Sequence, residues 1–155
     1  MEQEIPVRII QGLDFQFDDG GRAAAGFKGP ANDCVTRAIA IATGRQYREI
    51  YDEINALGRT EKERPKRWRS SARMGVHRPT ARRYLASLGW TWIPTMQIGS
   101  GCKVHLRKGE LPSGRLIVSV SRHVVAVIDG IVHDTGNPCR GGMRCVYGYF
   151  TLPEA

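Results

Sequence analysis

This 155-residue sequence lacks any long apolar run, because no run is longer than the five residues of Val124 to Ile128. A membrane-spanning helix needs about 18 or more consecutive apolar residues, so no membrane contact is expected. The N-terminal residues Met1 to Ile5 are acidic and carry no apolar stretch of the kind that a secretory signal requires. Cysteine is also scarce, at four residues, and without an export signal these thiols are predicted to be free. The sequence therefore predicts a protein of a reducing compartment, the cytoplasm.

The sequence also lacks internal repeats and the compositional bias of a disordered, collagen-like or coiled-coil chain. Hydrophobic residues make up 41% and charged residues 25%, which is ordinary for a globular domain. A chain of this length is about one domain long and can bury a core without disulfides or metals. We predict a single domain over residues 1–155, with no cofactor.

Acidic residues are scarce in one segment in particular. The net charge is +8, from 23 basic and 15 acidic residues. Residues 59–83 contain ten of the basic and two of the acidic residues, so this segment carries the whole excess. We expect this basic segment to be an insertion or a lid that contacts nucleic acid or an acidic partner. The candidate contacts are Lys66, Arg67, Trp68 and Arg69, with Trp68 as a base-stacking residue, and a solvated loop or charged helix face is the alternative.

Helical patterns come first along the chain and strand patterns follow. One helix is predicted from Cys34 to Gly44 with Asn32 or Asp33 as its cap, a second from 47 to 57 with Gly58 as its stop, and a third from Thr80 to Gly89. Strands are predicted over 7–10, 90–92, 115–120, 123–128, 131–135 and 144–152, with short extended pieces at 103–106. This order predicts an α+β domain with helices packed on a small antiparallel sheet. Trp90 and Trp92 are expected in its core.

The dipeptide Asp129-Gly130 between two β-branched runs predicts a two-residue hairpin. Such a loop pairs Ile128 with Ile131 and Val125 with Asp134. Asp134 then becomes the diagonal neighbour of His123, within reach of an imidazole–carboxylate contact, while His133 falls on the opposite face. A bulge would reverse that choice and make His133 the partner.

Cys34 stands at the predicted start of an amphipathic helix. The helix dipole and the free N–H groups there favour the thiolate, and a nearby imidazolium would favour it further. The neighbouring Asp33 carboxylate would oppose it unless it is turned away as a cap. An acid that orients the imidazole completes the arrangement used for nucleophilic catalysis. The order Cys34, His123, Asp134 therefore predicts a nucleophile, a general base and its orienting acid.

These two regions, Asn32-Asp33-Cys34-Val35-Thr36-Arg37-Ala38 and His123 to Asp134, resemble the papain-like cysteine peptidase superfamily. The C39-like and NlpC/P60-like branches are the most similar in style, and small phage and bacterial proteins carry this Asn-Asp-Cys helix. The resemblance implies a papain-like fold and a hydrolase that cleaves a peptide or other amide bond in a peptide or protein substrate. The family's oxyanion-hole Gln, six residues before the Cys, is replaced here by Lys28. Asn32, Gln11 or Gln16 is the candidate replacement, and in NlpC/P60 proteins the third polar residue is often a His, which aligns with His133.

Bland interpretations remain open beside this one. Cys34 could be a small core residue, His123 an ordinary strand-end histidine and Asp134 a turn cap. A catalytically inactive papain-like scaffold that binds through residues 59–83 is the alternative function. A zinc site is not expected, because the spacing of its five candidate ligands fits no known zinc motif. Those candidates are Cys102, Cys139, Cys145, His105 and His133.

Overall fold

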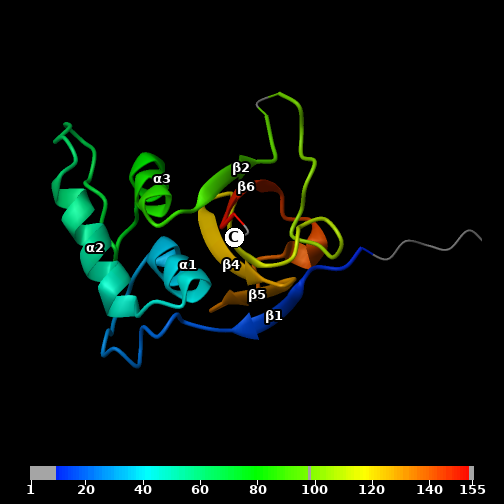
Figure 1. The fold of residues 1–155 in the computed structure, drawn as a ribbon, viewed down its shortest axis with the longest axis horizontal. Coiled ribbons are helices and arrows are strands. Elements are labelled where there is room, and N and C mark those ends of the chain that lie inside the picture. The colour runs from blue at the N-terminus through cyan, green and yellow to red at the C-terminus, as the bar shows by residue number, and fades with distance from the viewer. Residues whose placement is uncertain (1–9, 98, 154–155) are drawn as a thin grey trace, which may run out of the picture.

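The computed structural model describes residues 10–97 and 99–153 of the chain (Figure 1). Over these residues it contains three α-helices, a short 3-10 helix and six strands in one sheet. The helices are α1 (Cys34–Thr43), α2 (Tyr47–Arg59) and α3 (Arg78–Ser87), and the 3-10 helix is η1 (Arg140–Gly142). The strands are β1 (Asp14–Phe17), β2 (Thr91–Pro94), β3 (Arg115–Val120), β4 (His123–Ile128), β5 (Ile131–Asp134) and β6 (Val146–Thr151). The predicted α+β class is confirmed, and no described helix is long and apolar enough to cross a membrane.

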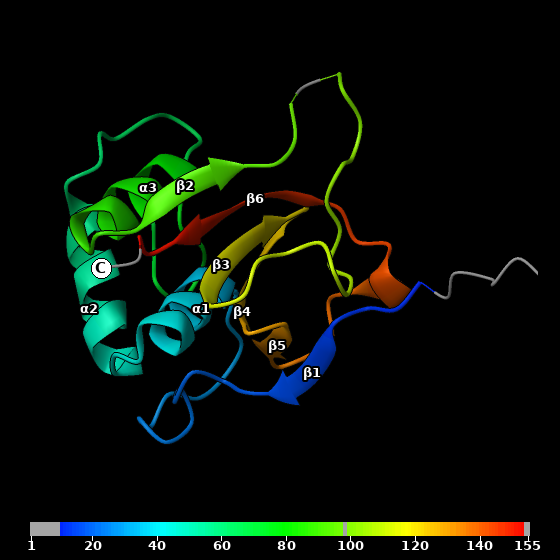
Figure 2. The ribbon, with the colours of Figure 1, turned by 45° about the vertical axis from the view of Figure 1, so that its right-hand side comes forward.

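The sheet has the strand order β1-β5-β4-β3-β6-β2. Every neighbouring pair is antiparallel except β1 and β5, which run parallel. The sheet is therefore mixed, and the prediction of a purely antiparallel sheet is wrong at this edge. The three helices gather on one side of the curved sheet, with α1 between α2 and the central strand β4 (Figures 1 and 2).

Both faces of the sheet are buried. On the helix side, Ile39 of α1, Ile50 of α2 and Leu85 of α3 pack with Ile117 and Phe150 of the sheet. On the other side, Leu116, Val118, Val127 and Val132 form a second core with Leu106, which comes from the irregular segment after β2. A strand buried on both faces shows a continuous apolar run rather than alternation, as β3 and β4 do.

The hairpin between β4 and β5 has the predicted register. Ala126 pairs with His133, Val127 with Val132 and Ile128 with Ile131 across the Asp129-Gly130 turn. Both turn residues have positive φ, which Asp and Gly tolerate better than most residues. No bulge shifts the pairing, so the hairpin brings the start of β4 and the end of β5 to the same place.

The other helix and strand boundaries differ in instructive ways. The second helix does not stop at Gly58 but runs to Arg59. The glycine is required there by packing, because the Ser70 backbone crosses the helix at this point and a methyl group would overlap its carbonyl oxygen. The third helix begins at Arg78 rather than Thr80, since Pro79 is accommodated in its first turn. Of the strand predicted over 7–10, residues 7–9 lie outside the described residues and Ile10 is not in a strand. The sequence reading missed β1 and started β6 two residues early.

Two of the four cysteines are not free. Cys102 and Cys145 form a disulfide, so the prediction of four reduced thiols is wrong for this pair. Their proximity arises from a tertiary contact, the isolated bridge between His105 and Cys145, which spacing along the chain does not show. Cys34 and Cys139 are the free cysteines of the described chain.

Candidate active site

The nucleophile candidate Cys34 is the first residue of α1. Its side chain is partly buried and lines a groove together with His123 and Val124 of β4. The packing of α1 on β4 brings Cys34 close to these two residues. Three predicted residues, Cys34, His123 and Asp134, therefore meet at the junction of the helix and the sheet.

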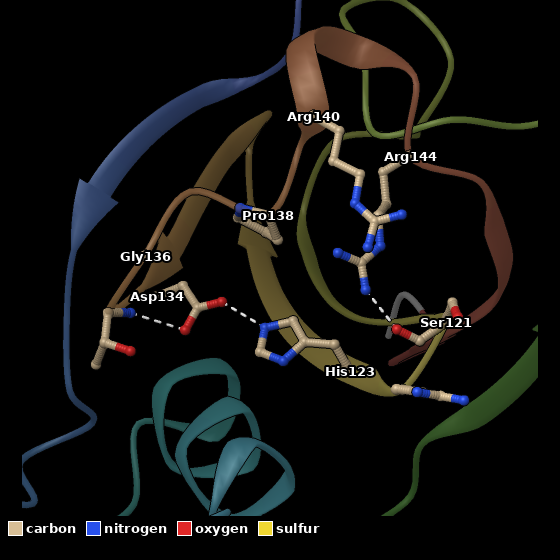
Figure 3. Close-up of a pocket in the computed structure, with 9 residues that line it drawn as sticks. Ser121, His123, Asp134, Gly136, Pro138, Arg140 and Arg144 are labelled. Atoms are coloured by element: carbon tan, nitrogen blue, oxygen red, sulfur yellow. Dashed lines mark hydrogen bonds and ion pairs between the residues drawn. The ribbon is translucent and has the colours of Figure 1, made fainter.

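His123 lies between the other two members. Its Nε2 is 2.6 Å from Oδ2 of Asp134, which confirms the predicted imidazole–carboxylate contact (Figure 3). The same ring borders the groove beside the Cys34 thiol, and the two groups shift each other's pKa values. Because Nε2 is committed to Asp134, Nδ1 is the ring atom available to the sulfur. His133 instead points to Asp18, with its Nδ1 3.5 Å from Oδ2, and takes no part in this contact.

The charges of these three groups support one another. The hydrogen bond with Asp134, followed by the interaction with Cys34, raises the pKa of His123 to about 9, against the opposing effect of burial. Burial alone would raise the pKa of Cys34, but the His123 ring, the Val124 backbone N–H and the Arg37 charge together hold it below its usual value. The pKa of Asp134 is likewise lowered: burial opposes the shift, and His123 and the Thr135 backbone N–H outweigh it. The directions of these shifts favour an imidazolium at His123 and the thiolate form of Cys34.

The structure reveals a buried charge network behind the site. Asp33, only 2% exposed, forms no side-chain cap on α1, so its predicted capping role is wrong. Its carboxylate instead pairs with Arg37 one turn along the helix and accepts a 2.6 Å hydrogen bond from the Tyr47 hydroxyl. A second nitrogen of Arg37 lies 3.3 Å from Oδ1 of Asp134. Arg37 thus links the residue before the cysteine to the acid behind the histidine.

Sequence reasoning missed Arg37. The available signal was its position four residues after Asp33, the spacing of a helical ion pair. Its second partner, Asp134, is 97 residues away and becomes a neighbour only in the folded chain. The Asp33 side chain is turned toward Arg37 and Tyr47, which is the condition under which it does not compete with the Cys34 thiolate.

The oxyanion candidates separate clearly. Asn32 is exposed and lines the groove beside Cys34, with its backbone N–H bonded to the Arg73 carbonyl. Gln16 lies on β1 and bonds to the carbonyl of Phe17, and Gln11 lies beside Lys108, so neither lines that groove. Lys28 holds the Arg73 guanidinium through its carbonyl oxygen. Asn32 is therefore the candidate that the structure places near the sulfur.

The groove that contains Cys34 has a volume of about 300 Å³ and walls of aromatic and aliphatic side chains. Trp92 of β2 packs against Phe150 of β6 at a ring-centroid distance of 4.8 Å. The Arg82 guanidinium stacks over Trp92 at 4.8 Å, and Arg78 over Tyr147 at 5.8 Å. We call this feature the aromatic groove. Trp90 is buried in the core as expected. Trp92 is half-buried: it packs against that core, and its ring also forms a wall of this groove.

The C-terminal part of the basic segment contributes to the same groove. The lining residues from this part are Met74, Gly75, Val76, Arg78, Ala81 and Arg82. Lys66, Arg67, Trp68 and Arg69 are exposed and lie outside its lining, with Trp68 79% exposed. Glu61 anchors the segment through Ser70 and Thr80, whose hydrogen bonds lower its pKa against the effect of burial. These four residues are not part of the Cys34 site.

The candidate zinc ligands do not form a set. Cys102 and Cys145 are consumed by the disulfide, Cys139 is buried, and His105 pairs with Glu110. Over residues 10–97 and 99–153 there is no cluster of three or more His, Cys, Asp or Glu side chains that could hold a metal ion.

Comparison with known proteins identifies no relative of this chain. No protein-family model, no curated protein and no solved structure matches the chain.

Proposed function

We propose that this protein is a cysteine hydrolase with a papain-like fold that cleaves a peptide or other amide bond. The proposal is supported by the position of His123, which is hydrogen-bonded to Asp134 and lines the groove beside Cys34. This arrangement raises the pKa of the histidine and lowers that of the thiol, as nucleophilic catalysis at neutral pH requires.

In the first half-reaction, the Cys34 thiolate attacks the carbonyl carbon of the substrate. The resulting oxyanion accepts hydrogen bonds from the free backbone N–H of Cys34 and the side-chain amide of Asn32. The C–N bond then breaks as the His123 imidazolium gives its proton to the leaving amine. A thioester on Cys34 and a neutral imidazole remain.

In the second half-reaction, neutral His123 removes a proton from a water molecule, whose oxygen attacks the thioester. The C–S bond breaks, the carboxylic acid leaves and the thiolate–imidazolium pair is restored. Asp134 orients the ring and stabilises its charge in both steps. The aromatic groove is the place for apolar side chains on the acyl side of the bond, because its walls adjoin Cys34.

A peptide library from a digested proteome tests this proposal without knowledge of the substrate. We expect the wild-type protein to generate new peptide termini that mass spectrometry detects, and Cys34→Ala to generate none. Cys139→Ala is the matched control, because it removes the other free thiol, which is buried away from the site. Cleavage that persists in folded Cys34→Ala, or a folded wild type that cleaves nothing, would contradict the proposal.

The exposed tip of the basic segment supports a second candidate function, nucleic-acid binding by a catalytically inactive scaffold. Trp68 is 79% exposed between Arg67 and Arg69, an arrangement suited to base stacking and phosphate contact. This function predicts binding of a labelled single-stranded oligonucleotide that weakens with salt, survives Cys34→Ala and is lost in Arg64→Gln/Arg67→Gln/Arg69→Gln. Binding that is unchanged in the triple variant would exclude this interface.

A further inference from the structure

A second hollow adjoins the aromatic groove at His123. It has a volume of about 590 Å³, and His123 and Asp134 form one wall (Figure 3). Arg122, Arg140 and Arg144 line the rest, and we call it the arginine pocket. Figure 3 shows the side chains of Arg140 and Arg144 extending from the same side, at η1 and the segment after it, in the direction of Ser121. His123 and Arg122 border both the groove and the pocket.

The positive charge of this pocket has no partner among the described residues. No carboxylate of residues 10–97 or 99–153 forms an ion pair with Arg122, Arg140 or Arg144. Asp134 lines the wall, but its Oδ2 is bonded to His123 and its Oδ1 to Arg37 and the Thr135 N–H. Arg144 donates to the Ser121 carbonyl, while its buried Nε has no partner in this part of the chain. The pocket therefore presents positively charged guanidinium donors of the kind that bind anions.

Two of the three arginines sit where the backbone disfavours them. Arg122 has φ 55° and Arg140 has φ 51°, both in the left-handed region where Gly or Asn is the usual residue. Folding alone would favour a smaller residue at both positions. Strained residues of this kind concentrate at ligand-binding sites, where the side chain serves the ligand.

We propose that the arginine pocket binds a carboxylate on the leaving-group side of the substrate, either an acidic side chain or a chain-terminal carboxylate. The inference rests on the proposed function for the direction of the substrate. Cys34 lines only the aromatic groove, whereas His123, which protonates the leaving amine, borders both spaces. A substrate with its carbonyl at Cys34 therefore passes the His123 ring and continues into the arginine pocket.

Binding of small probes tests whether the arginine pocket binds a carboxylate, independently of catalytic activity. The probes are aspartic acid amide and glycylglycine, each compared with its uncharged counterpart, asparagine amide and glycylglycinamide. They are titrated at constant ionic strength into the Cys34→Ala protein and followed by NMR signals of Gly136 and the arginine side chains. We expect the charged probes to shift these signals and the uncharged ones to leave them in place. The stronger of the two charged probes identifies the source of the carboxylate.

The variant Arg122→Asn/Arg140→Asn makes this test specific. Asn tolerates the left-handed backbone, so we expect the thermal midpoint to stay equal or rise while carboxylate affinity falls about tenfold or more. The control Arg45→Gln/Lys108→Gln removes two surface charges that pair with Glu49 and Asp14, and it is expected to bind like the parent. Equal binding of charged and uncharged probes, no shift with either, or unchanged affinity in the asparagine variant would overturn the proposal.

The peptide library then places the carboxylate relative to the cleaved bond. We expect the residue on the leaving-group side of the cleaved bond to be Asp, Glu or the last residue of its chain. This preference should be lost in Arg122→Asn/Arg140→Asn. Cleavage without such a preference would overturn the leaving-group placement. If the probes bind but nothing is cleaved, the hydrolase proposal and the leaving-group placement both fail, and only the anion-binding pocket stands.

Discussion

Replacement of Asp134 by Asn is the perturbation whose effect the structure fixes most closely. The amide keeps the shape of the side chain and can still accept a hydrogen bond from Nε2 of His123. It removes the negative charge of the acceptor, so the hydrogen bond that is the largest cause of the raised pKa of His123 no longer favours the imidazolium as a carboxylate does. Burial of the ring then opposes the imidazolium, so we expect the pKa of His123 to fall toward its ordinary value of 6.5 or below.

The size of this effect follows from the two pKa values. The fall from about 9 to 6.5 corresponds to about 3 kcal/mol, which is an upper limit because Cys34 contributes part of it. At pH 7.5 the ring is about 97% protonated with the first value and about 9% with the second, a tenfold loss of the ion pair. A raised pKa stabilises the fold below pH 6.5, and this contribution is lost as pH rises through about 9. The stability difference between wild type and Asp134→Asn should therefore be larger near pH 6 than above pH 9.

An NMR titration of the His123 ring and the alkylation rate of Cys34 at pH 7.5 measure both effects. The matched control is His133→Asn, which alters the neighbouring residue that faces Asp18 on the other side of the strand. We expect the control to match wild type and Asp134→Asn to lose reactivity by up to about tenfold. Equal His123 titration in Asp134→Asn and wild type would refute the electrostatic reasoning.

Three further predictions concern the framework of the site. Arg37→Met removes the cation that two buried carboxylates share, while Asp33 keeps Arg22 and Asp134 keeps His123. Urea denaturation should therefore show a loss of about 1–3 kcal/mol, and an unchanged free energy of unfolding would count against the network. Gly58→Ala should destabilise the fold by about 1–3 kcal/mol through overlap with the Ser70 carbonyl, whereas Gly136→Ala, which has open space around it, should change stability by less than about 0.5 kcal/mol. Cys102→Ser/Cys145→Ser opens a loop of 43 residues and should lower the free energy of unfolding by up to about 4 kcal/mol, with an unchanged alkylation rate at Cys34. An equal denaturation midpoint for this variant and the wild type under oxidising conditions would argue against the disulfide.

The geometry that could be predicted from the sequence is the geometry that local chemistry sets. The Asp129-Gly130 turn fixes the register of β4 and β5, and the register alone selects Asp134 over His133 as the partner of His123. The start of α1 at Cys34 likewise follows from the helical pattern that begins there. These features depend on residues close together in the chain.

The features that escaped prediction depend on distant residues. Arg37 reaches Asp134 across 97 positions, and Cys102 meets Cys145 only because the segment after β2 folds back along β6. Gly58 has the pattern of a helix stop, yet it lies inside α2. The residue is a glycine because the Ser70 backbone crosses the helix there and leaves no room for a side chain. Trp92 has the pattern of a core residue, and it does pack against the core. Its ring is only half-buried, however, because one side lines the groove beneath Arg82 of α3.

The measurement that tests the central claim most directly is the alkylation rate of Cys34 as a function of pH, in wild type and in His123→Ala. Peptide mass spectrometry separates it from Cys139, whose pKa is raised by burial and which serves as the internal reference. We predict that Cys34 of the wild type reacts below pH 9 and loses most of this reactivity in His123→Ala, where burial opposes the thiolate and only the Val124 N–H and the Arg37 charge favour it. A Cys34 that reacts no faster than Cys139, or that reacts equally fast without His123, would contradict the thiolate–imidazolium pair.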